Sequence, residues 1–430
     1  MKNNSTIINQ ATAFRKLLTS GGLTFMYRIG GLLFSFLITF FITKNYGESI
    51  YGNYALIFTL LQASTMIFAL GLPNALISYL GLHEIDAHFS QFILKKGLKI
   101  LLLTAILPSI LYYFLSTEIA ISIFNNEKLI VYIKIIALTL PFSIFHEFIL
   151  SFFIATRNFV KFNIFMFIVP NLFFLILLLI FSISEENQWY TILFYSISIG
   201  FTVITALFFA VKKHQKEQLE TISAKQMIQF SSPMMLSSLM LFLLNWTDVF
   251  MLGAMVSDAQ LGIYNLAYKL ASLGMLVIIS MNVVLAPKIA ELYKLNQISE
   301  LHKTIKNATR VVILLTLPVI VVMLVFSDFI LGIFGDSFIQ GKMAFIIITV
   351  GVFLNVITGN VDQILNMTNN QKVLRNCTIF GFALNVVLNY FLIPKYGIVG
   401  AAIASMFTNV VFNVTCLFFI KKRLGFYTFI

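Results

Sequence analysis

The sequence predicts an all-α polytopic membrane protein. Of its 430 residues, 59% are hydrophobic and 11% are charged, whereas soluble domains carry about 25% charged residues. Phe alone occurs 46 times, and the mean hydropathy is +0.93. Apolar stretches follow one another along the chain, and each has the roughly 20 residues that a helix needs to cross a bilayer. These observations exclude a soluble globular protein.

We expect twelve membrane-spanning helices, because twelve apolar stretches alternate with short polar connections. They cover approximately residues 19–43, 52–80, 97–117, 129–155, 162–183, 189–211, 231–256, 261–287, 310–330, 341–367, 372–393 and 397–420. An even number of spans places both termini on the same side of the membrane. The connections are too short to contain a soluble domain, so the protein is expected to work inside the membrane.

The basic residues predict which side that is. Most of the 29 Lys and Arg residues lie in the termini and in the even-numbered connections. The connections on the opposite side contain only Lys44, Lys128, Lys342 and Lys395. Because basic residues accumulate on the cytoplasmic side of membrane proteins, both termini are expected to be cytoplasmic. The same asymmetry accounts for the net charge of +12 without a nucleic-acid partner.

The chain is expected to consist of two halves joined by its longest polar connection. The halves are residues 1–211 and 231–430, and residues 212–230 form a cytoplasmic linker. Gly52 in the first half and Gly262 in the second stand 210 positions apart, and each is followed two residues later by Tyr at the start of a span. Six spans per half give both halves the same orientation, related by a pseudo-two-fold axis along the membrane normal. Repeats of this kind are typical of transporters, with the binding site at their interface.

Several segments are similar to polysaccharide flippases. They are Asp248 with residues 251–253 and 261–269, residues 286–290 at the end of the eighth span, residues 385–394 and 396–404 around the last connection, and residues 51–54 and 71–75 near the N-terminus. The chain thereby resembles the Wzx-type O-antigen flippases. Their superfamily also contains the MATE multidrug exporters and the lipid II flippase.

The resemblance implies a MATE-like, V-shaped pair of six-helix bundles that alternate access between the two sides of the membrane. It implies that the substrate is an undecaprenyl-diphosphate-linked oligosaccharide, moved from the cytoplasmic to the periplasmic leaflet of the bacterial inner membrane. A polysaccharide polymerase and a chain-length regulator would be partner proteins. No cofactor is expected.

Arg28 and Lys269 are the candidate contacts for the anionic diphosphate, because charged residues within spans normally face a cavity or the bundle interior. Arg28 lies in the inner half of the first span and Lys269 near the middle of the eighth. Arg can bind a diphosphate through two parallel hydrogen bonds, whereas Lys acts as a point charge. Alternatively, each pairs with an acid and holds helices together. For Lys269 the partner would be Asp248, at a matched depth in the seventh span.

Three aromatic residues near the level of Asp248 and Lys269 are candidate sugar contacts. They are Trp246, Tyr264 and Tyr268, whose rings could stack on sugar rings. The alternative is ordinary packing, since 15% of the chain is aromatic.

Asp248, Glu147, His146 and Asp362 are candidates for coupling to a proton or sodium gradient, because intramembrane groups that change charge are typical of proton relays. His146 and Glu147 are neighbours in the fourth span and therefore point about 100° apart on a helix. As an alternative, His146 is a hydrogen-bonded residue between helices.

Two other functions compete with a flippase. A multidrug or cation exporter of the same superfamily would carry cationic substrates, which fits poorly with Arg28 and Lys269. A membrane polymerase or acyltransferase would need a large outer loop with basic or catalytic residues, but the outer connections are short and acidic. The sequence contains no P-loop, dinucleotide fingerprint, GxSxG or His-rich metal spacing. We therefore expect neither an enzyme nor a metal site.

Overall fold

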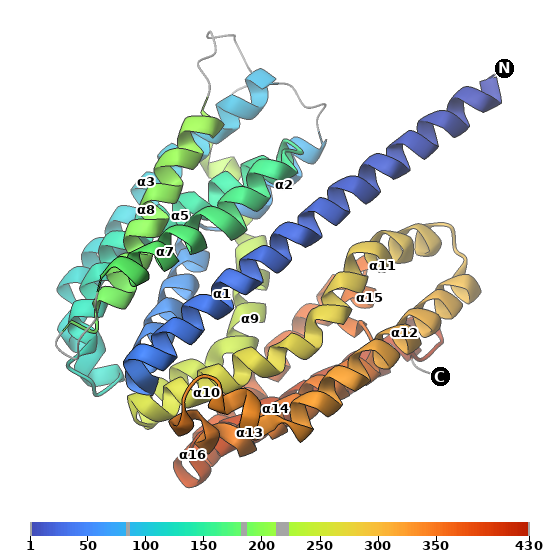
Figure 1. Ribbon diagram of the computed structural model, residues 1–430. Helices are drawn as coiled ribbons and strands as arrows, with labels where there is room; N and C mark the ends of the chain where they lie inside the picture. The colour runs from blue at the N-terminus through green and yellow to red at the C-terminus, as the bar shows by residue number, and fades with distance from the viewer. Residues whose placement is uncertain (1, 83–86, 182–186, 212–222, 429–430) are drawn as a thin grey trace. The chain divides into compact units, whose positions relative to one another are not determined.

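The computed structural model describes residues 2–82, 87–181, 187–211 and 223–428, which form helices joined by short turns and, within these ranges, no strand (Figure 1). Ten of the described helical stretches are long and apolar enough to cross a membrane. Two of them, Met26–Phe68 and Gln371–Leu424, are 43 and 54 residues long and bend at Gly47 and Gly397. Each is long enough for two crossings. The predicted all-α fold with twelve spans is thereby confirmed.

Both bends depend on glycine. Gly47 has φ 79° and Gly397 has φ 56°, and residues with a Cβ rarely adopt such positive values. At each of these glycines the backbone leaves helical φ/ψ values, so two helices meet there at a kink. Gly47 lies in the predicted connection after the first span, and Gly397 is the first residue of the predicted twelfth span.

The described residues cluster into two compact units. The first comprises Met1–Phe41, Leu61–Ser122 and Asn126–Leu236, and the second comprises Ile42–Leu60, Ile123–Asn125 and Ser237–Ile430. Residues 42–60 thus pack with the second unit, although they belong to the N-terminal half of the sequence. Residues 212–222 of the expected linker lie outside the described residues.

The first unit is built around α5, which packs against α2, α3 and α8. Seventeen residues of α5 are buried, among them Tyr132 and Phe148. The helices that contribute to this unit are α1 (Lys2–Phe68), α2 (Leu72–Leu82), α3 (Ala87–Phe114), α4 (Ser116–Glu118), η1 (Ile119–Ile123), α5 (Leu129–Ala155), α6 (Phe159–Asn163), η2 (Ile164–Ile168), α7 (Val169–Ile180) and α8 (Tyr190–Ala210).

The second unit is organised around α14, which packs against α10, α12 and α16. Its helices are α9 (Ala224–Met255), α10 (Asp258–Ala271), η3 (Ser272–Met275), α11 (Leu276–Lys294), α12 (Ile298–Val325), α13 (Ser327–Gly332), η4 (Asp336–Gly341), α14 (Lys342–Thr358), α15 (Val361–Met367) and α16 (Gln371–Leu424). A core of Leu, Ile, Phe and both Cys residues fills the space between α11, α12, α15 and α16.

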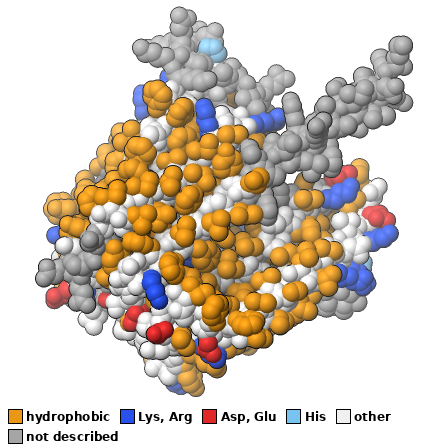
Figure 2. Space-filling model, in the orientation of Figure 1, with side chains coloured by type: hydrophobic (Ala, Val, Ile, Leu, Met, Phe, Trp, Pro, Cys, Tyr) orange, Lys and Arg blue, Asp and Glu red, His pale blue; other side chains and the backbone are white. Residues whose placement is uncertain are grey.

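Large hydrophobic side chains are also exposed on the helix surfaces. Phe208 is 82% exposed, Phe114 is 74% exposed and Leu103 is 73% exposed. Figure 2 shows hydrophobic side chains along the flanks of the helices and charged side chains towards their ends. Soluble proteins rarely expose apolar patches of this extent, so these surfaces are those of a multi-pass membrane protein.

The two glycines that stand 210 positions apart contact each other within the second unit. A Cβ on Gly52 would lie 2.0 Å from the Asp258 carbonyl oxygen, and a Cβ on Gly262 would lie 2.0 Å from the Glu48 carbonyl oxygen. Next to this contact, the Asn53 side-chain amide donates to Asp258 Oδ2 at 3.0 Å. Each glycine therefore leaves room for the backbone of the other helix.

Replacing Gly52 with Ala should force α1 and α10 apart. We expect the free energy of unfolding to fall by about 1–3 kcal/mol, the usual effect of overpacking. Thermal unfolding of the purified protein measures this effect. Gly200→Ala is the matched control, because a Cβ on Gly200 of α8 meets no atom within 4 Å. Equal melting temperatures for the two variants would show that the glycine contact contributes nothing.

Candidate functional site

Asp248 of α9 is a buried carboxylate that is held by hydroxyl groups. Its side chain is 1% exposed. Oδ2 accepts one hydrogen bond from the Tyr264 hydroxyl of α10 and a second from Ser405 Oγ of α16, at 2.7 Å. Among the described residues, Oδ1 has no hydrogen-bond partner. One oxygen of the carboxylate is thus satisfied and the other is available to a proton or a cation.

Lys269 is not a partner of this carboxylate. The hydrogen bonds and ion pairs between described residues join Asp248 to Tyr264 and Ser405, so the alternative of an Asp248–Lys269 pair does not hold in this structure. The reason is helical geometry, because Lys269 stands five residues after Tyr264 and points about 140° away from it around the helix axis. Lys269 lies in the last turn of α10, half-buried, where Ser272 Oγ bonds its carbonyl oxygen at 2.7 Å.

The three candidate sugar contacts form one aromatic row along α9 and α10. The rings of Trp246 and Tyr268 are 5.9 Å apart between centroids, and those of Tyr268 and Tyr264 are 6.3 Å apart. Phe242 extends the row, 6.0 Å from Trp246. Trp246 and Tyr268 are half-buried, whereas Tyr264 is fully buried and reaches Asp248.

Further buried polar residues lie one helical turn from a contact between α9 and α16. A Cβ on Gly381 would touch Leu244 and Phe412, at 3.2 and 3.7 Å, so α9 meets the two arms of α16, which precede and follow Gly397, at this level. Asp248 and Asn385 each follow this level by one helical turn, after Leu244 and Gly381, and Thr408 precedes Phe412 by one turn. Each of these three polar residues is about 1% exposed.

The side-chain oxygen atoms of Asp248, Asn385, Asn389 and Thr408 are only partly hydrogen-bonded. Asn389 Nδ2 donates to Asn385 Oδ1 at 2.9 Å. In the described part of the chain, Asn389 Oδ1 and Thr408 Oγ1 have no hydrogen-bond partner, like Asp248 Oδ1. Since buried polar atoms are normally hydrogen-bonded, these unpaired oxygen atoms are available to a bound proton, water or small cation. Ser405, Asn385, Asn389 and Thr408 were not among the predicted site residues, because uncharged polar residues are common within spans.

Arg28 belongs to the first unit. It is exposed on α1, and its guanidinium carbon lies 6.0 Å from the centre of the Phe167 ring of η2. In the described part of the chain it takes part in no ion pair. The guanidinium is therefore placed by a ring contact that leaves its hydrogen-bond donors available to an anion.

His146 and Glu147 of α5 point to different surroundings, as their adjacency predicts. His146 is 7% exposed, and its Nε2 lies 3.0 Å from the Phe165 carbonyl oxygen of η2. This is the contact between helices that the alternative interpretation of His146 expects. Glu147 is half-buried and lies near Tyr195 of α8.

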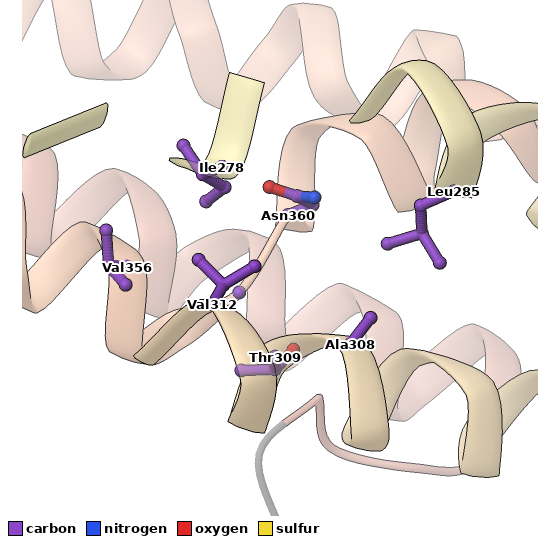
Figure 3. Close-up of a pocket in the computed structure, with 8 residues that line it drawn as sticks. Ile278, Leu285, Ala308, Thr309, Val312, Val356 and Asn360 are labelled. Carbon is purple, nitrogen blue, oxygen red and sulfur yellow. The ribbon is translucent and has the colours of Figure 1, made fainter. Parts of the chain in front are cut away.

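Asp362 follows a break in the predicted tenth span. α14 ends at Thr358, Gly359 has φ 76°, and α15 begins at Val361. Asp362 is exposed in the first turn of α15. A small pocket opens at the break, with Asn360 and Thr309 among aliphatic side chains of α11, α12 and α14 (Figure 3). The candidate site residues do not line this pocket.

Comparison with known proteins establishes the family. Residues 17–293, well over half of the chain, match the family described as polysaccharide biosynthesis protein. The chain belongs to the polysaccharide biosynthesis protein family. Residues 233–391 also match the MatE family, which covers much of the second unit.

Two curated relatives of this family member come from Haloferax volcanii. The probable low-salt glycan biosynthesis flippase Agl15 is 26% identical over 214 residues, 50% of this chain and 45% of the relative. The probable flippase AglR is 28% identical over 169 residues, 38% of this chain and 35% of the relative. The matched region thus spans less than half the length of these relatives.

Solved structures show that the polysaccharide biosynthesis protein has the fold of MOP-superfamily transporters. The inward closed lipid II flippase MurJ superposes with a TM-score of 0.77 at 16% identity, over 94% of this chain and 87% of MurJ. An inward-facing multidrug resistance MATE transporter superposes with a TM-score of 0.75 at 13% identity, over 92% and 94% of the two chains.

Proposed function

We propose that the protein is a flippase for an undecaprenyl-diphosphate-linked oligosaccharide, such as an O-antigen repeat unit. It moves the head group from the cytoplasmic to the periplasmic leaflet of the bacterial inner membrane by alternating access of two six-helix bundles, residues 1–211 and 231–430. The observation that carries the proposal is the aromatic row of Trp246, Tyr268 and Tyr264 in membrane-spanning helices of a polysaccharide biosynthesis protein, with Lys269 on one of the same helices. The row offers ring faces to sugars, and Lys269 offers a positive charge to the diphosphate.

A flippase needs such groups because the head group carries charge and many hydroxyls. Transfer of an unsatisfied polar group into an apolar medium costs about 2–7 kcal/mol. In this proposal Arg28 and Lys269 are the cationic contacts for the diphosphate. Half-buried Trp246 and Tyr268 contact the sugars with their ring faces. Tyr264 is buried, and its hydroxyl donates a hydrogen bond to Asp248.

We further propose that flipping is coupled to a proton or sodium gradient through Asp248. Its Oδ1, which has no hydrogen-bond partner among the described residues, and the likewise unpaired oxygen atoms of Asn389 and Thr408 on α16 support this role. A bound proton or sodium ion would neutralise the carboxylate during one half of the cycle. Glu147, half-buried beside Tyr195, is the second coupling candidate. Flipping that continues unchanged after both gradients are dissipated would contradict this coupling.

Deletion of the gene followed by lipid analysis tests the function. We expect lipid-linked repeat units to accumulate with their sugars on the cytoplasmic face, and surface polysaccharide to disappear. The multidrug exporter of the same superfamily is the second candidate, and its fold is equally compatible with the chain. Normal surface polysaccharide together with altered drug resistance would favour the exporter and contradict the flippase.

Replacing Trp246 with Leu should slow flipping about tenfold, the effect of losing about 1.4 kcal/mol of binding in the transition state. Trp246→Phe keeps an aromatic face and should be affected less. Trp189→Leu is the control, because Trp189 is the other tryptophan of the chain, also half-buried, and lies in the first unit against Tyr190. Equal flipping rates for Trp246→Leu and Trp189→Leu would show that the aromatic row does not contact the substrate.

A further inference from the structure

The predicted fifth span contains a π-helical turn, η2, between α6 and α7. At its end the N–H of Val169 bonds the Ile164 carbonyl oxygen, five residues back instead of the four of an α-helix. Pro170 follows directly, in the first turn of α7. Such wide turns are rare and occur frequently at functional sites.

Pro170 deprives the next carbonyl of its backbone donor. At the same five-residue spacing, the Phe165 carbonyl oxygen would pair with residue 170, but proline has no N–H. An unpaired carbonyl within a membrane span is costly, and neighbouring side chains commonly supply the missing donor. Here the donor is His146 of α5, with Nε2 3.0 Å from the Phe165 oxygen. Because a carbonyl only accepts hydrogen bonds, Nε2 is the donor.

The same turn sets the position of the Phe167 ring. α1 approaches the turn so closely that a Cβ on Gly31 would lie 2.7 Å from the Phe167 Cβ. Arg28 precedes Gly31 by three residues and therefore lies on the same face of α1. Its guanidinium carbon is 6.0 Å from the Phe167 ring centre. A shift of the turn would displace the ring on which the guanidinium rests.

We propose that His146 is a positioning residue for Arg28. By donating to the Phe165 carbonyl, it stabilises the turn that Pro170 leaves incomplete and so keeps Phe167 beneath the guanidinium. The role of Arg28 in this inference rests on the proposed flippase function. The role of His146 requires a hydrogen-bond donor at the place of Nε2, and it does not require a group that changes charge.

Two amide variants of His146 test whether its role is to donate a hydrogen bond or to change charge. His146→Gln places its amide nitrogen near the position of Nε2, whereas His146→Asn places it near that of Nδ1. We expect His146→Gln to melt within about 1 °C of the unmodified protein and His146→Asn to melt about 2–4 °C lower, the scale of one lost buried hydrogen bond. Equal losses in the two variants would overturn the proposal.

Pro170→Ala provides the second test, because it restores the missing N–H. In the full-length protein, adding Pro170→Ala to His146→Asn should recover at least half of the lost melting temperature. If the effects of the two substitutions simply add, Pro170 and His146 do not serve the same carbonyl, and the proposal fails.

Flipping measures whether His146 acts through Arg28. The probe is a fluorescent polyprenyl-diphosphate-linked N-acetylglucosamine in liposomes that contain the full-length protein. We expect His146→Asn to flip it about tenfold more slowly, and Arg28→Ala with His146→Asn to flip it no more slowly than Arg28→Ala alone. Losses that multiply would overturn the positioning role. If the unmodified protein flips nothing, the proposed function fails and the role of Arg28 with it, while the melting temperatures still decide whether His146 holds the turn.

Discussion

Flipping by the Arg28→Ala variant is expected to fall by about 10- to 100-fold at an unchanged protein level. Hydrogen bonds to charged groups contribute about 1.5–3 kcal/mol, and each 1.4 kcal/mol corresponds to a factor of ten in rate. The protein level should not change, because Arg28 is exposed and its guanidinium lies against the Phe167 ring. Flipping of a fluorescent lipid-linked oligosaccharide in proteoliposomes measures the loss.

Lys134→Ala is the matched control for Arg28→Ala. Lys134 is also an exposed cation within a span of the first unit, and its Nζ lies 5.7 Å from the centre of the Tyr113 ring. Arg28→Lys should have an intermediate rate, since it keeps the charge and loses the paired donors. Full activity of Arg28→Ala, or an equal loss in Lys134→Ala, would exclude Arg28 as a specific diphosphate contact.

The Asp248→Asn variant should fold normally and lose gradient-driven flipping by about 10-fold or more. The Asn oxygen can still accept from Tyr264 and Ser405, so the network that holds α9, α10 and α16 together persists. The amide cannot take up a proton or supply a negative charge to a cation, so coupling is lost. Initial flipping rates with and without an imposed gradient measure this effect. We expect the variant to show the same slow rate in both conditions.

Two control variants separate coupling from stability. Ser405→Ala removes one hydrogen bond and keeps the carboxylate, so it should lower the free energy of unfolding by about 1 kcal/mol and still respond to the gradient. The exchange of charges in Asp248→Lys with Lys269→Asp should be inactive, because Asp248 bonds hydroxyl groups and not Lys269. Full activity of the exchanged protein would show that the two residues act as an ion pair.

Hydropathy predicted the spans because the membrane imposes one requirement on every crossing segment, a run of about 20 apolar residues. Such a run says little about the path of the backbone within it. The turn at η2 and the break at Gly359 both interrupt predicted spans. Gly359–Asn360 is a turn signal inside an apolar stretch, so this break was open to prediction from the sequence.

The candidate site was only partly predictable, since its contacts join distant parts of the chain. Asp248, Tyr264, Tyr268 and Trp246 lie within one short segment, and their proximity follows from two consecutive helices. Ser405 bonds Asp248 from 157 positions away, and no charge or spacing indicates this partner. The sequence placed Lys269 at the depth of Asp248, but depth alone does not determine the direction in which a side chain points.

Reconstitution of the purified protein is the most direct test of the central claim. A fluorescent undecaprenyl-diphosphate-linked oligosaccharide is placed in both leaflets of liposomes, and a membrane-impermeant quencher is added outside. We predict that only liposomes with the protein lose the fluorescence of the inner leaflet. The rate of this loss should be lower for Arg28→Ala and unchanged for Lys134→Ala. Equal quenching in liposomes with and without the protein, together with uptake of a cationic dye that depends on the protein, would contradict the account.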